Sequence, residues 1–413
     1  ENGHFRLKGQ KIYISYGEHD MADNIIHMVL ARLPDAPAGT KGISLFLVPK
    51  VLVNKDGSLG QRNDLRCASV EHKLGIHARP TCVMSYGDND GAIGYLIGEE
   101  NEGLKAMFTM MNMARFNVGL QGVALAERAY QQARDFAKER VQGRLDGGGP
   151  EKVAIINHPD VRRMLLDIKS RTEAMRALAY DTAVQFDISK RHPDEAARKE
   201  ARTRLDLLTP IVKAWSTDVG VELTSLAVQV HGGMGFVEET GIAQHYRDSR
   251  IAPIYEGTNG IQARDLVGRK VLRDRGETAK EYMAEIRSIA ADAANLAAPA
   301  DSIGRALTTS VDALSRTTDW LIEIGTETPG RAFAGATAYL ELFGVVAGGA
   351  LMARSAIAAA GLLSGDPENA PFYEAKLATA RYYALHILPK AESLAISISE
   401  GADVILDLPE DAF

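Results

Sequence analysis

Gln229-Val-His-Gly-Gly-Met-Gly-Phe236 is the stretch that says most about the fold, because three of its residues are glycines that follow a long helical pattern. A backbone without side chains can approach a flat or phosphorylated ligand closely, or it can form an ordinary helix cap and turn. Composition alone leaves both interpretations open. The stretch has neither the Gly-Lys-Ser/Thr ending of a P-loop nor the strand–glycine–helix context of a Rossmann nucleotide site.

A second stretch lies a short distance downstream and reads Arg247-Asp-Ser-Arg-Ile-Ala-Pro-Ile-Tyr-Glu-Gly-Thr258. It places Glu256 after several apolar residues. Apolar surroundings disfavour the charged form of a carboxylate, which suits a general base that holds a proton transiently. A surface turn is the ordinary alternative. The sequence contains no His-Glu-x-x-His, Cys-x-x-Cys or Gly-x-Ser-x-Gly motif, so it predicts neither a metal site nor a serine hydrolase.

The sequence pattern on either side of these motifs changes near residue 100. Short β-rich runs separated by turns predict strands at 4–15, 25–31, 43–48, 68–73 and 81–86. Helical spacing then predicts helices at about 101–140, 158–188, 204–230, 276–297, 301–326, 329–363 and 368–400. The expected fold class is α+β, mostly α. A small antiparallel β-domain (1–100) is followed by a helical bundle (101–270) and a second C-terminal helical domain (271–413).

Composition excludes several classes of protein. A net charge of −7 provides no global basic field, so we expect no nucleic-acid partner. Two cysteines, Cys67 and Cys82, exclude a disulfide scaffold. The most apolar segment, 336–363, is interrupted by Glu341 and Arg354, so we expect no membrane span. No targeting signal is visible, and we expect a cytoplasmic location.

Taken together, the motifs resemble the acyl-CoA dehydrogenase family of flavoproteins over residues 1 to about 270. The resemblance rests on Gln229-x-His-Gly-Gly-x-Gly, Arg247-Asp-x-Arg-Ile and Ile254-Tyr-Glu-Gly-Thr in that order, and on Gly98-Glu-Glu-Asn-Glu-Gly ahead of the long helix. The part after residue 270 resembles the extra helical domain of a larger subgroup, which includes the 3-methylmercaptopropionyl-CoA dehydrogenases.

The resemblance implies an FAD-dependent oxidoreductase that forms a homodimer or a dimer of dimers. In this family FAD lies between the β-domain and the bundle and extends to a neighbouring subunit. An acyl-CoA substrate, either a fatty acyl-CoA or 3-methylthiopropanoyl-CoA, would become the 2-enoyl-CoA, and electrons would pass to an electron-transfer flavoprotein. The family's N-terminal helical domain and flavin-binding loop have no counterpart here. We therefore expect the 413 residues to be the C-terminal two-thirds of a longer subunit.

By the same resemblance, Glu256 is the catalytic base that removes the α-proton while the β-hydride moves to the flavin. The backbone N–H of Glu256 would donate a hydrogen bond to the thioester carbonyl and stabilise the developing enolate. Tyr255 and Gly257 flank the base and are expected to contact the substrate. Asn112 and Arg115 match an Asp-x-x-Arg pair that holds the CoA moiety. The alternative for this pair is two ordinary polar residues on a helix.

The resemblance also assigns a set of FAD contacts. Arginine suits the pyrophosphate because its planar fork makes two charge-assisted hydrogen bonds. Tyr13 stands where the family often has tryptophan, and Gly260 stands where it commonly has Gln or Glu, so a side-chain contact is lost or moved there. The residues expected to bind FAD are Tyr13, Ser15, Arg140, Gln142, Gln229, Gly232, Gly233, Thr258 and Gly260.

Two other functions stay open from the sequence. An acyl-CoA oxidase-like enzyme would share the fold and let O2 reach the reduced flavin. A non-catalytic CoA-binding or scaffold relative would also share it, although the retained Glu256 counts against that alternative.

Overall fold

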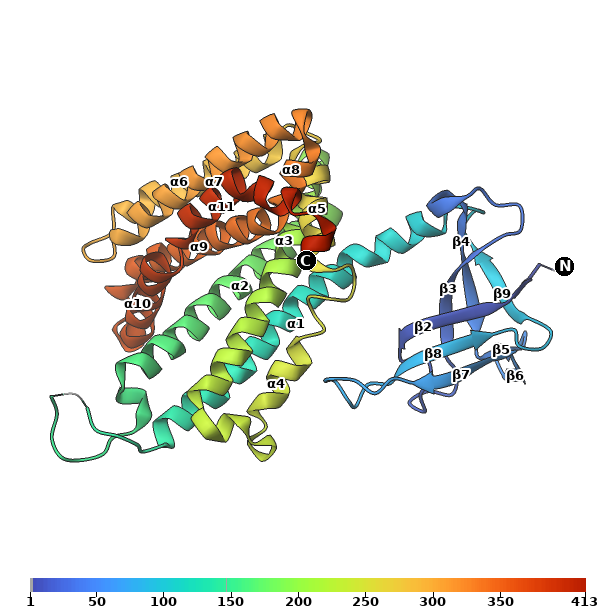
Figure 1. Ribbon diagram of the computed structural model, residues 1–413, viewed down its shortest axis with the longest axis horizontal. Coiled ribbons are helices and arrows are strands. Elements are labelled where there is room, and N and C mark those ends of the chain that lie inside the picture. Colours follow the sequence, from blue (N-terminus) through green and yellow to red (C-terminus); the bar gives the residue numbers. More distant parts are fainter. Residues whose placement is uncertain (1–2, 146) are drawn as a thin grey trace. The chain divides into compact units, whose positions relative to one another are not determined.

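The computed structural model describes residues 3–145 and 147–413, and it divides into two compact units, Glu1–Ala114 and Arg115–Phe413. Each unit is described by itself (Figure 1). Helix α1 (Gly103–Glu139) begins in the first unit and continues into the second.

Besides the start of α1, the described part of the first unit contains nine strands and one short 3-10 helix (Gly39–Gly42). Every strand pairing in it is antiparallel, with sheet orders β1-β9-β4-β3, β2-β8-β7 and β5-β6. The strands are β1 (Phe5–Leu7), β2 (Gly9–Ser15), β3 (Ile26–Arg32), β4 (Ile43–Pro49), β5 (Val51–Val53), β6 (Leu59–Arg62), β7 (Leu65–Val70), β8 (Thr81–Tyr86) and β9 (Ala92–Ile97).

The core of the first unit is built mainly on the central strands β4 and β8. Val48, Cys82 and Met84 are fully buried, and Phe46 is nearly so. The predicted strands at 25–31, 43–48 and 81–86 are confirmed within a few residues. The segment predicted at 4–15 forms two strands, β1 and β2, in different sheets, and the strand predicted at 68–73 is β7, which begins three residues earlier. The prediction missed β5, β6 and β9, which are short or carry a glycine inside the strand. Such strands give a weak periodic signal.

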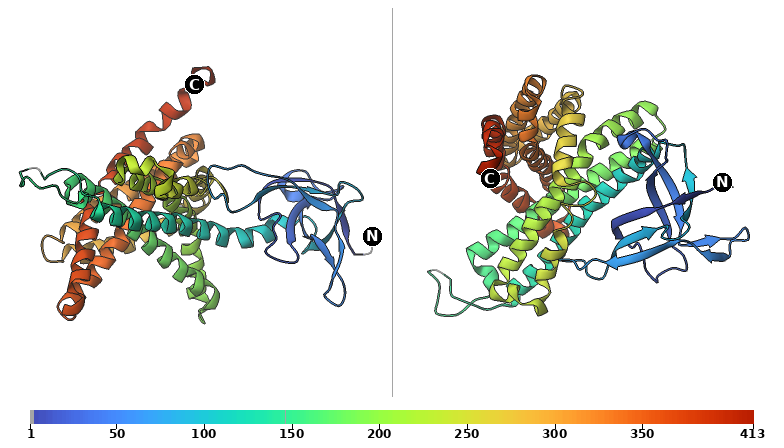
Figure 2. Two further views of the ribbon diagram at one scale, coloured as in Figure 1. Left: turned by 90° about the horizontal axis from the view of Figure 1, so that it is seen from below. Right: turned by 45° about the vertical axis from the view of Figure 1, so that its right-hand side comes forward.

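Eleven α-helices, counting α1, are present in the described residues, and short 3-10 turns and one π-helical turn (Leu266–Val271) connect several of them. Besides α1, the helices are α2 (Pro159–Arg191), α3 (Glu195–Val230), α4 (Ile242–Ser249), α5 (Asn259–Asp265), α6 (Glu277–Ala294), α7 (Ser302–Glu327), α8 (Pro329–Ala334), α9 (Ala336–Leu363), α10 (Ala370–His386) and α11 (Lys390–Asp407). Helices α2 and α3 run side by side, and the orange to red helices of the C-terminal part pack together beside them (Figure 2).

Three helix predictions were wrong in detail. Helix α3 begins at Glu195 rather than near residue 204, because Asp194 caps it by accepting a hydrogen bond of 3.0 Å from the Ala196 N–H. The predicted helix at 329–363 is two helices that meet at Gly335, and the one at 368–400 is interrupted just before Pro389. The predicted four-helix C-terminal part therefore contains more helices, since proline and a tightly packed glycine end helices locally.

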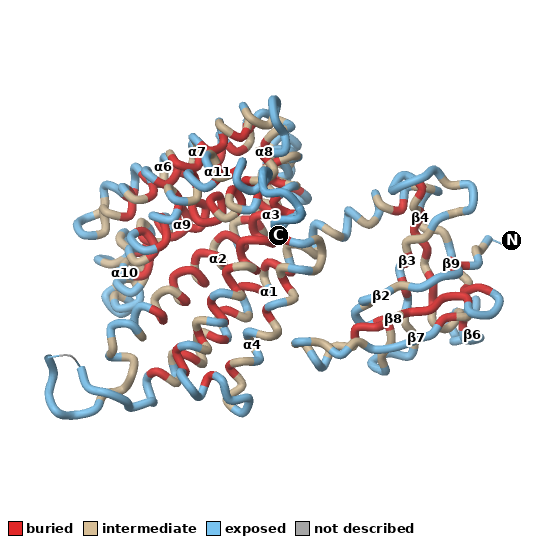
Figure 3. Tube along the Cα trace, in the orientation of Figure 1, coloured by how far each residue is buried: buried red, intermediate tan, exposed pale blue. Residues whose placement is uncertain are grey.

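The two helical parts of the second unit share one hydrophobic core, which continues from α2 and α3 into α9 (Figure 3). Gly344 and Gly348 of α9 lie directly on the ring of the buried Trp215: a Cβ at Gly344 would be 2.3 Å from the Trp215 Cγ. The predicted fold class is confirmed. The predicted domain boundaries stay a prediction, because a shared core does not decide whether 101–270 and 271–413 could fold separately.

Helix α9 is long and apolar enough to cross a membrane by length and composition, and it is the one helix among the described residues that meets this test. Its most apolar window is 78% buried inside the fold. A core helix of a helical bundle has the same composition, because neighbouring helices cover it on all sides.

Candidate active site

Residues 251–258, which we call the glutamate turn, connect the end of α4 to the start of α5. Glu256 has a φ of +58° and Gly257 a φ of +85°, so two consecutive residues adopt the left-handed conformation. A left-handed glutamate costs about 1–2 kcal/mol, so the conformation persists only where surrounding contacts impose it. The N–H of Asn259, the first residue of α5, donates to the Pro253 carbonyl of the turn at 2.9 Å.

Helix α1 contributes contacts to one side of the glutamate turn. The Tyr255 hydroxyl donates a hydrogen bond to the side-chain oxygen of Gln121. Arg115 lies beside Gly257: its Nη2 is 3.7 Å from the position that a Cβ on Gly257 would occupy. Arg115 also faces Asp265, with 4.0 Å between Nη1 and the carboxylate. The structure thus brings four predicted residues together: Arg115, Tyr255, Glu256 and Gly257.

Helix α3 supports the turn from beneath through Lys213, whose side chain has no exposed surface. The Lys213 ammonium donates to the Gly257 carbonyl at 2.9 Å and to the Asn259 Oδ1 at 2.7 Å. The Asn259 amide nitrogen in turn donates to the Asp218 carboxylate at 2.7 Å and to the Thr217 hydroxyl at 2.9 Å. Lys213 and Asn259 were not predicted from the sequence. The feature that could have identified Lys213 is the presence of a lysine within the mostly apolar run 207–215.

The pKa of Lys213 is lowered to about 8. Burial is the main cause and Arg115 adds to it, while Asp218 and Glu256 oppose the shift. Burial likewise raises the pKa of Asp218 above its ordinary value, although Asn259 and Lys213 oppose that shift.

We expect this lysine to make stability depend on pH. The unfolded chain holds the Lys213 proton up to the ordinary lysine pKa of 10.5, and the folded chain releases it near pH 8. Between these values the unfolded state binds more protons, so stability rises with pH. From about pH 7 to about pH 10, the unfolding free energy of the wild type should gain about 2 kcal/mol relative to Lys213→Met. Urea denaturation at several pH values measures this difference, and a constant difference would contradict it.

The glycine stretch lies at the far end of α3. His231 caps the helix, its ring stacks on Phe136 of α1 at 4.3 Å between ring centroids, and its Nδ1 lies 2.8 Å from the Ala227 carbonyl oxygen. Gly232 has a φ of +57°, and nothing lies within 4 Å of a Cβ placed on Gly232 or Gly233. The stretch therefore forms the predicted helix cap and turn, and close approach of its open backbone to a ligand stays a prediction.

The arginine predicted to meet a phosphate lies at this same end of the bundle. The Arg140 N–H donates to the Phe136 carbonyl at 2.9 Å, so Arg140 lies one helical turn after the residue that stacks on His231. Its guanidinium donates to the Gln142 Oε1 at 3.2 Å, and both side chains are exposed. Gln229 is also exposed. An exposed guanidinium and two open glycines fit a phosphate-bearing cofactor such as FAD.

The glutamate turn and the glycine stretch are separated within one subunit. Lys213, under the turn, and Val230, at the end of α3, are seventeen residues apart on one helix, or about 25 Å at 1.5 Å per residue. The structure therefore brings the predicted site residues together in two groups rather than one. Thr258 belongs to the first group, where its hydroxyl caps α5 by accepting from the Ile261 N–H at 3.3 Å, and Gly260 lies in the first turn of that helix.

Three predicted residues belong to the first unit. Tyr13 has a φ of +60° and is 69% exposed, and the β2–β8 register shifts between Lys11 and Ile14. Tyr13 and Ser15 therefore lie on a bulged strand, and simple strand alternation does not describe them. Strained residues of this kind concentrate at functional sites. Asn112 is an exposed residue of α1.

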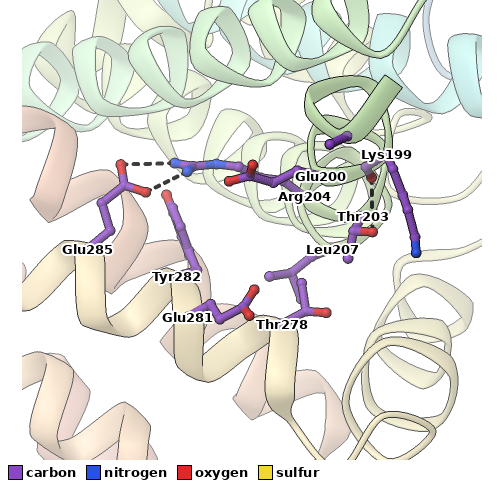
Figure 4. A pocket seen from close by; sticks show the side chains of 10 residues that line it. Lys199, Glu200, Thr203, Arg204, Leu207, Thr278, Glu281, Tyr282 and Glu285 are labelled. Carbon is purple, nitrogen blue, oxygen red and sulfur yellow. Dashed lines mark hydrogen bonds and ion pairs between the residues drawn. The ribbon is translucent and has the colours of Figure 1, made fainter. Parts of the chain in front are cut away.

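A pocket between α3 and α6 contains none of the predicted site residues (Figure 4). On one wall of the pocket Arg204 bonds to Glu285, and the Arg204 guanidinium lies 4.7 Å from the ring centroid of Tyr282. We assign this pocket no part in the chemistry.

The fold and the two groups of residues define a class: a chain with a small antiparallel unit and a helical unit that carries a buttressed glutamate turn and an exposed glycine end. Residues 101–272 match the family model "Acyl-CoA dehydrogenase, C-terminal domain", and 282–409 match "Acetyl-CoA dehydrogenase C-terminal like". The chain is 48% identical to the 3-methylmercaptopropionyl-CoA dehydrogenase of Ruegeria pomeroyi, over 98% of this chain and 68% of that protein.

Two further comparisons agree. The chain is 37% identical to a butyryl-CoA dehydrogenase of Syntrophomonas wolfei, over 99% of this chain and 68% of that protein. The solved structure of an acyl-CoA dehydrogenase complexed with FAD from Bacillus anthracis superposes with a TM-score of 0.71 at 18% identity, over 99% of this chain and 65% of that one. The chain belongs to the acyl-CoA dehydrogenase family, whose members are FAD-dependent oxidoreductases. The predicted family and cofactor are confirmed.

Proposed function

We propose that this chain carries the catalytic base of an acyl-CoA dehydrogenase, which converts an acyl-CoA thioester to the 2-enoyl-CoA. The observation that carries the proposal is the glutamate turn: Glu256 is left-handed, half-buried and held from two helices, with Arg115 beside it. A surface turn would need neither the buried lysine nor the aromatic anchor that hold this one.

The chemistry we assign to Glu256 begins with the removal of the α-proton of the thioester by its carboxylate. The developing charge on the thioester carbonyl needs a hydrogen-bond donor. Among the hydrogen bonds of the described residues, none uses the Glu256 N–H, so this donor is available to the carbonyl oxygen. FAD, when bound, accepts the hydride that leaves the β-carbon. The carbon–carbon double bond forms as the proton and the hydride depart.

For the CoA moiety we propose Arg115 and Asn112. The Arg115 side chain is mostly buried, and its Nε has no hydrogen-bond partner among the described residues. A buried guanidinium nitrogen without a partner is costly, and a bound acceptor would satisfy it. Tyr255 and Gly257 flank the base and complete the proposed substrate contacts.

For FAD we propose the predicted set of contacts. The open backbone at Gly232 and Gly233, with Arg140 at the same end of the bundle, supports a nucleotide site there. This end lies far along α3 from Glu256, which supports a homo-oligomer in which this end serves the FAD of a neighbouring subunit. The remaining proposed contacts are Tyr13, Ser15, Gln142, Gln229, Thr258 and Gly260.

For the substrate we propose a short or medium acyl-CoA thioester, with 3-methylthiopropanoyl-CoA as the first to test. The 48% identity to a 3-methylmercaptopropionyl-CoA dehydrogenase supports this order. An electron-transfer flavoprotein is the proposed electron acceptor. A cytoplasmic location stays a prediction.

The test is the bleaching of enzyme-bound flavin by a panel of thioesters in the absence of oxygen. The panel contains 3-methylthiopropanoyl-CoA and straight-chain thioesters of short, medium and long length. Bleaching by at least one thioester, with the 2-enoyl-CoA as product, is expected. A flavin that stays yellow with every thioester would refute the proposal. Fast reoxidation in air with release of peroxide would instead indicate an oxidase.

A further inference from the structure

Lys213 occupies a position that packing alone does not favour. Its side chain is completely buried on α3, and no carboxylate of the described residues lies within ion-pair distance of its ammonium. A buried ammonium without an ion-pair partner is unfavourable unless hydrogen bonds compensate for the lost water. The two partners that compensate here, the Gly257 carbonyl and the Asn259 side chain, belong to the glutamate turn and the first residue of α5.

These two hydrogen bonds fix the part of the backbone that follows the proposed base. The Gly257 carbonyl belongs to the peptide immediately after the left-handed pair Glu256–Gly257. The side-chain nitrogen of Gln262 is the second donor near this carbonyl, at 3.4 Å. Asn259 is tied to α3 by hydrogen bonds to Ala214, Thr217 and Asp218. The turn is therefore attached to one rigid helix at two successive points.

We propose that Lys213 is a positioning residue for Glu256: with Asn259 it holds the left-handed turn that presents the carboxylate and the N–H of Glu256 to the thioester. This inference rests on the proposed function. Lys213 touches neither substrate nor cofactor in this role and acts through the turn.

The position of Lys213 gives the proposal a second, independent readout. The charged groups that face its ammonium are Asp218 from α3, Arg115 from α1 and Glu256 from the turn. Lys213 acts through the turn and does not touch the thioester. Its loss should therefore lower the limiting rate of flavin reduction more than it changes the apparent affinity for the thioester.

The experiment compares the FAD-loaded wild type with Lys213→Met, which fills a similar volume without charge or donors. Stopped-flow flavin reduction by a reactive thioester should be about 100-fold slower in K213M, because small misplacements of a reacting group cost about this much. The thioester concentration that gives half the limiting rate should change by less than about threefold. Hydrogen exchange of the peptide that covers 250–262 should be faster in K213M.

Two matched variants separate positioning from general damage. Lys169→Met removes another lysine of the helical unit, a half-buried one that pairs with Glu173, and should change neither the limiting rate nor the half-saturating thioester concentration. Asn259→Ala removes the second attachment of the turn and should slow flavin reduction, again with little change in the half-saturating concentration. If K213M does not fold with FAD, the same rate and exchange measurements on N259A test whether attachment of the turn to α3 positions Glu256.

The outcomes distinguish this proposal from the proposed function. A wild-type limiting rate of flavin reduction and unchanged hydrogen exchange in K213M would overturn the role of Lys213 and leave Glu256 as the base. If no thioester bleaches the wild-type flavin, the proposed function fails. In that case exchange of the turn in K213M still tests whether Lys213 holds it.

Discussion

Glu256→Gln is expected to bind FAD and fold like the wild type but to lose flavin reduction by acyl-CoA thioesters by a factor of about 1,000 or more. The glutamine keeps the size and the hydrogen-bonding reach of the side chain and can adopt the same turn. It cannot accept the α-proton at neutral pH, so removal of that proton loses its base. Anaerobic stopped-flow absorbance of the flavin measures the loss directly.

The control for this variant is Glu239→Gln. Glu239 is an exposed acid in the 3-10 turn Glu238–Thr240, ahead of α4, and has no assigned role. It should leave the reduction rate unchanged. Bleaching of the flavin in E256Q at the wild-type rate would show that a residue other than Glu256 is the base. Loss of FAD from E256Q would instead show that Glu256 is structural.

The second large effect concerns the contact between α1 and α3, where the helices meet through glycines. A Cβ on Gly122 would be 2.2 Å from the Ser216 carbonyl oxygen, and a Cβ on Gly220 would be 3.0 Å from the Gly122 Cα. The clashing atoms are backbone atoms, which cannot move aside without moving a helix. We expect Gly122→Ala to cost about 3 kcal/mol of stability. Thermal and urea unfolding of the FAD-loaded protein measure this loss.

The same substitution should also slow flavin reduction. Gln121, which precedes Gly122, accepts the hydrogen bond from Tyr255, so a shifted α1 carries one anchor of the glutamate turn with it. Gly361→Ala is the matched control, because Gly361 is exposed near the end of α9 with nothing within 4 Å of the added Cβ. Alanine there should be neutral or stabilise by up to about 1 kcal/mol. Equal stability of G122A and G361A would show that the helices can separate without cost.

The candidate site shows where sequence reasoning stops. The motif around Glu256 was recognisable because its residues are consecutive, and so were the glycines after α3. Lys213 lies forty-three residues before the base, and its partners could not be read from the sequence. The periodicity of α3 could show that the face around Lys213 is buried. It could not show that the Lys213 ammonium meets a backbone carbonyl of the glutamate turn.

Tyr13 shows the same limit on a smaller scale. An alternating strand pattern predicts that Tyr13 and Ser15 share a face. The register of β2 against β8 contains a bulge, which gives Tyr13 its positive φ. A bulge depends on how two strands pair, and the partner strand lies about seventy residues further along the chain.

The sequence by itself determined the family, the order of the β and helical parts, the identity of the proposed base and the position of the open glycines. These features depend on local periodicity and on consecutive motifs, which a single stretch of chain contains in full. Only the tertiary structure decided that α1 and α3 meet through Gly122 and Gly220, that α9 packs on Trp215, and that Lys213 holds the glutamate turn. These features depend on which residues face each other when helices distant in sequence cross, and close packing between helices fixes that choice.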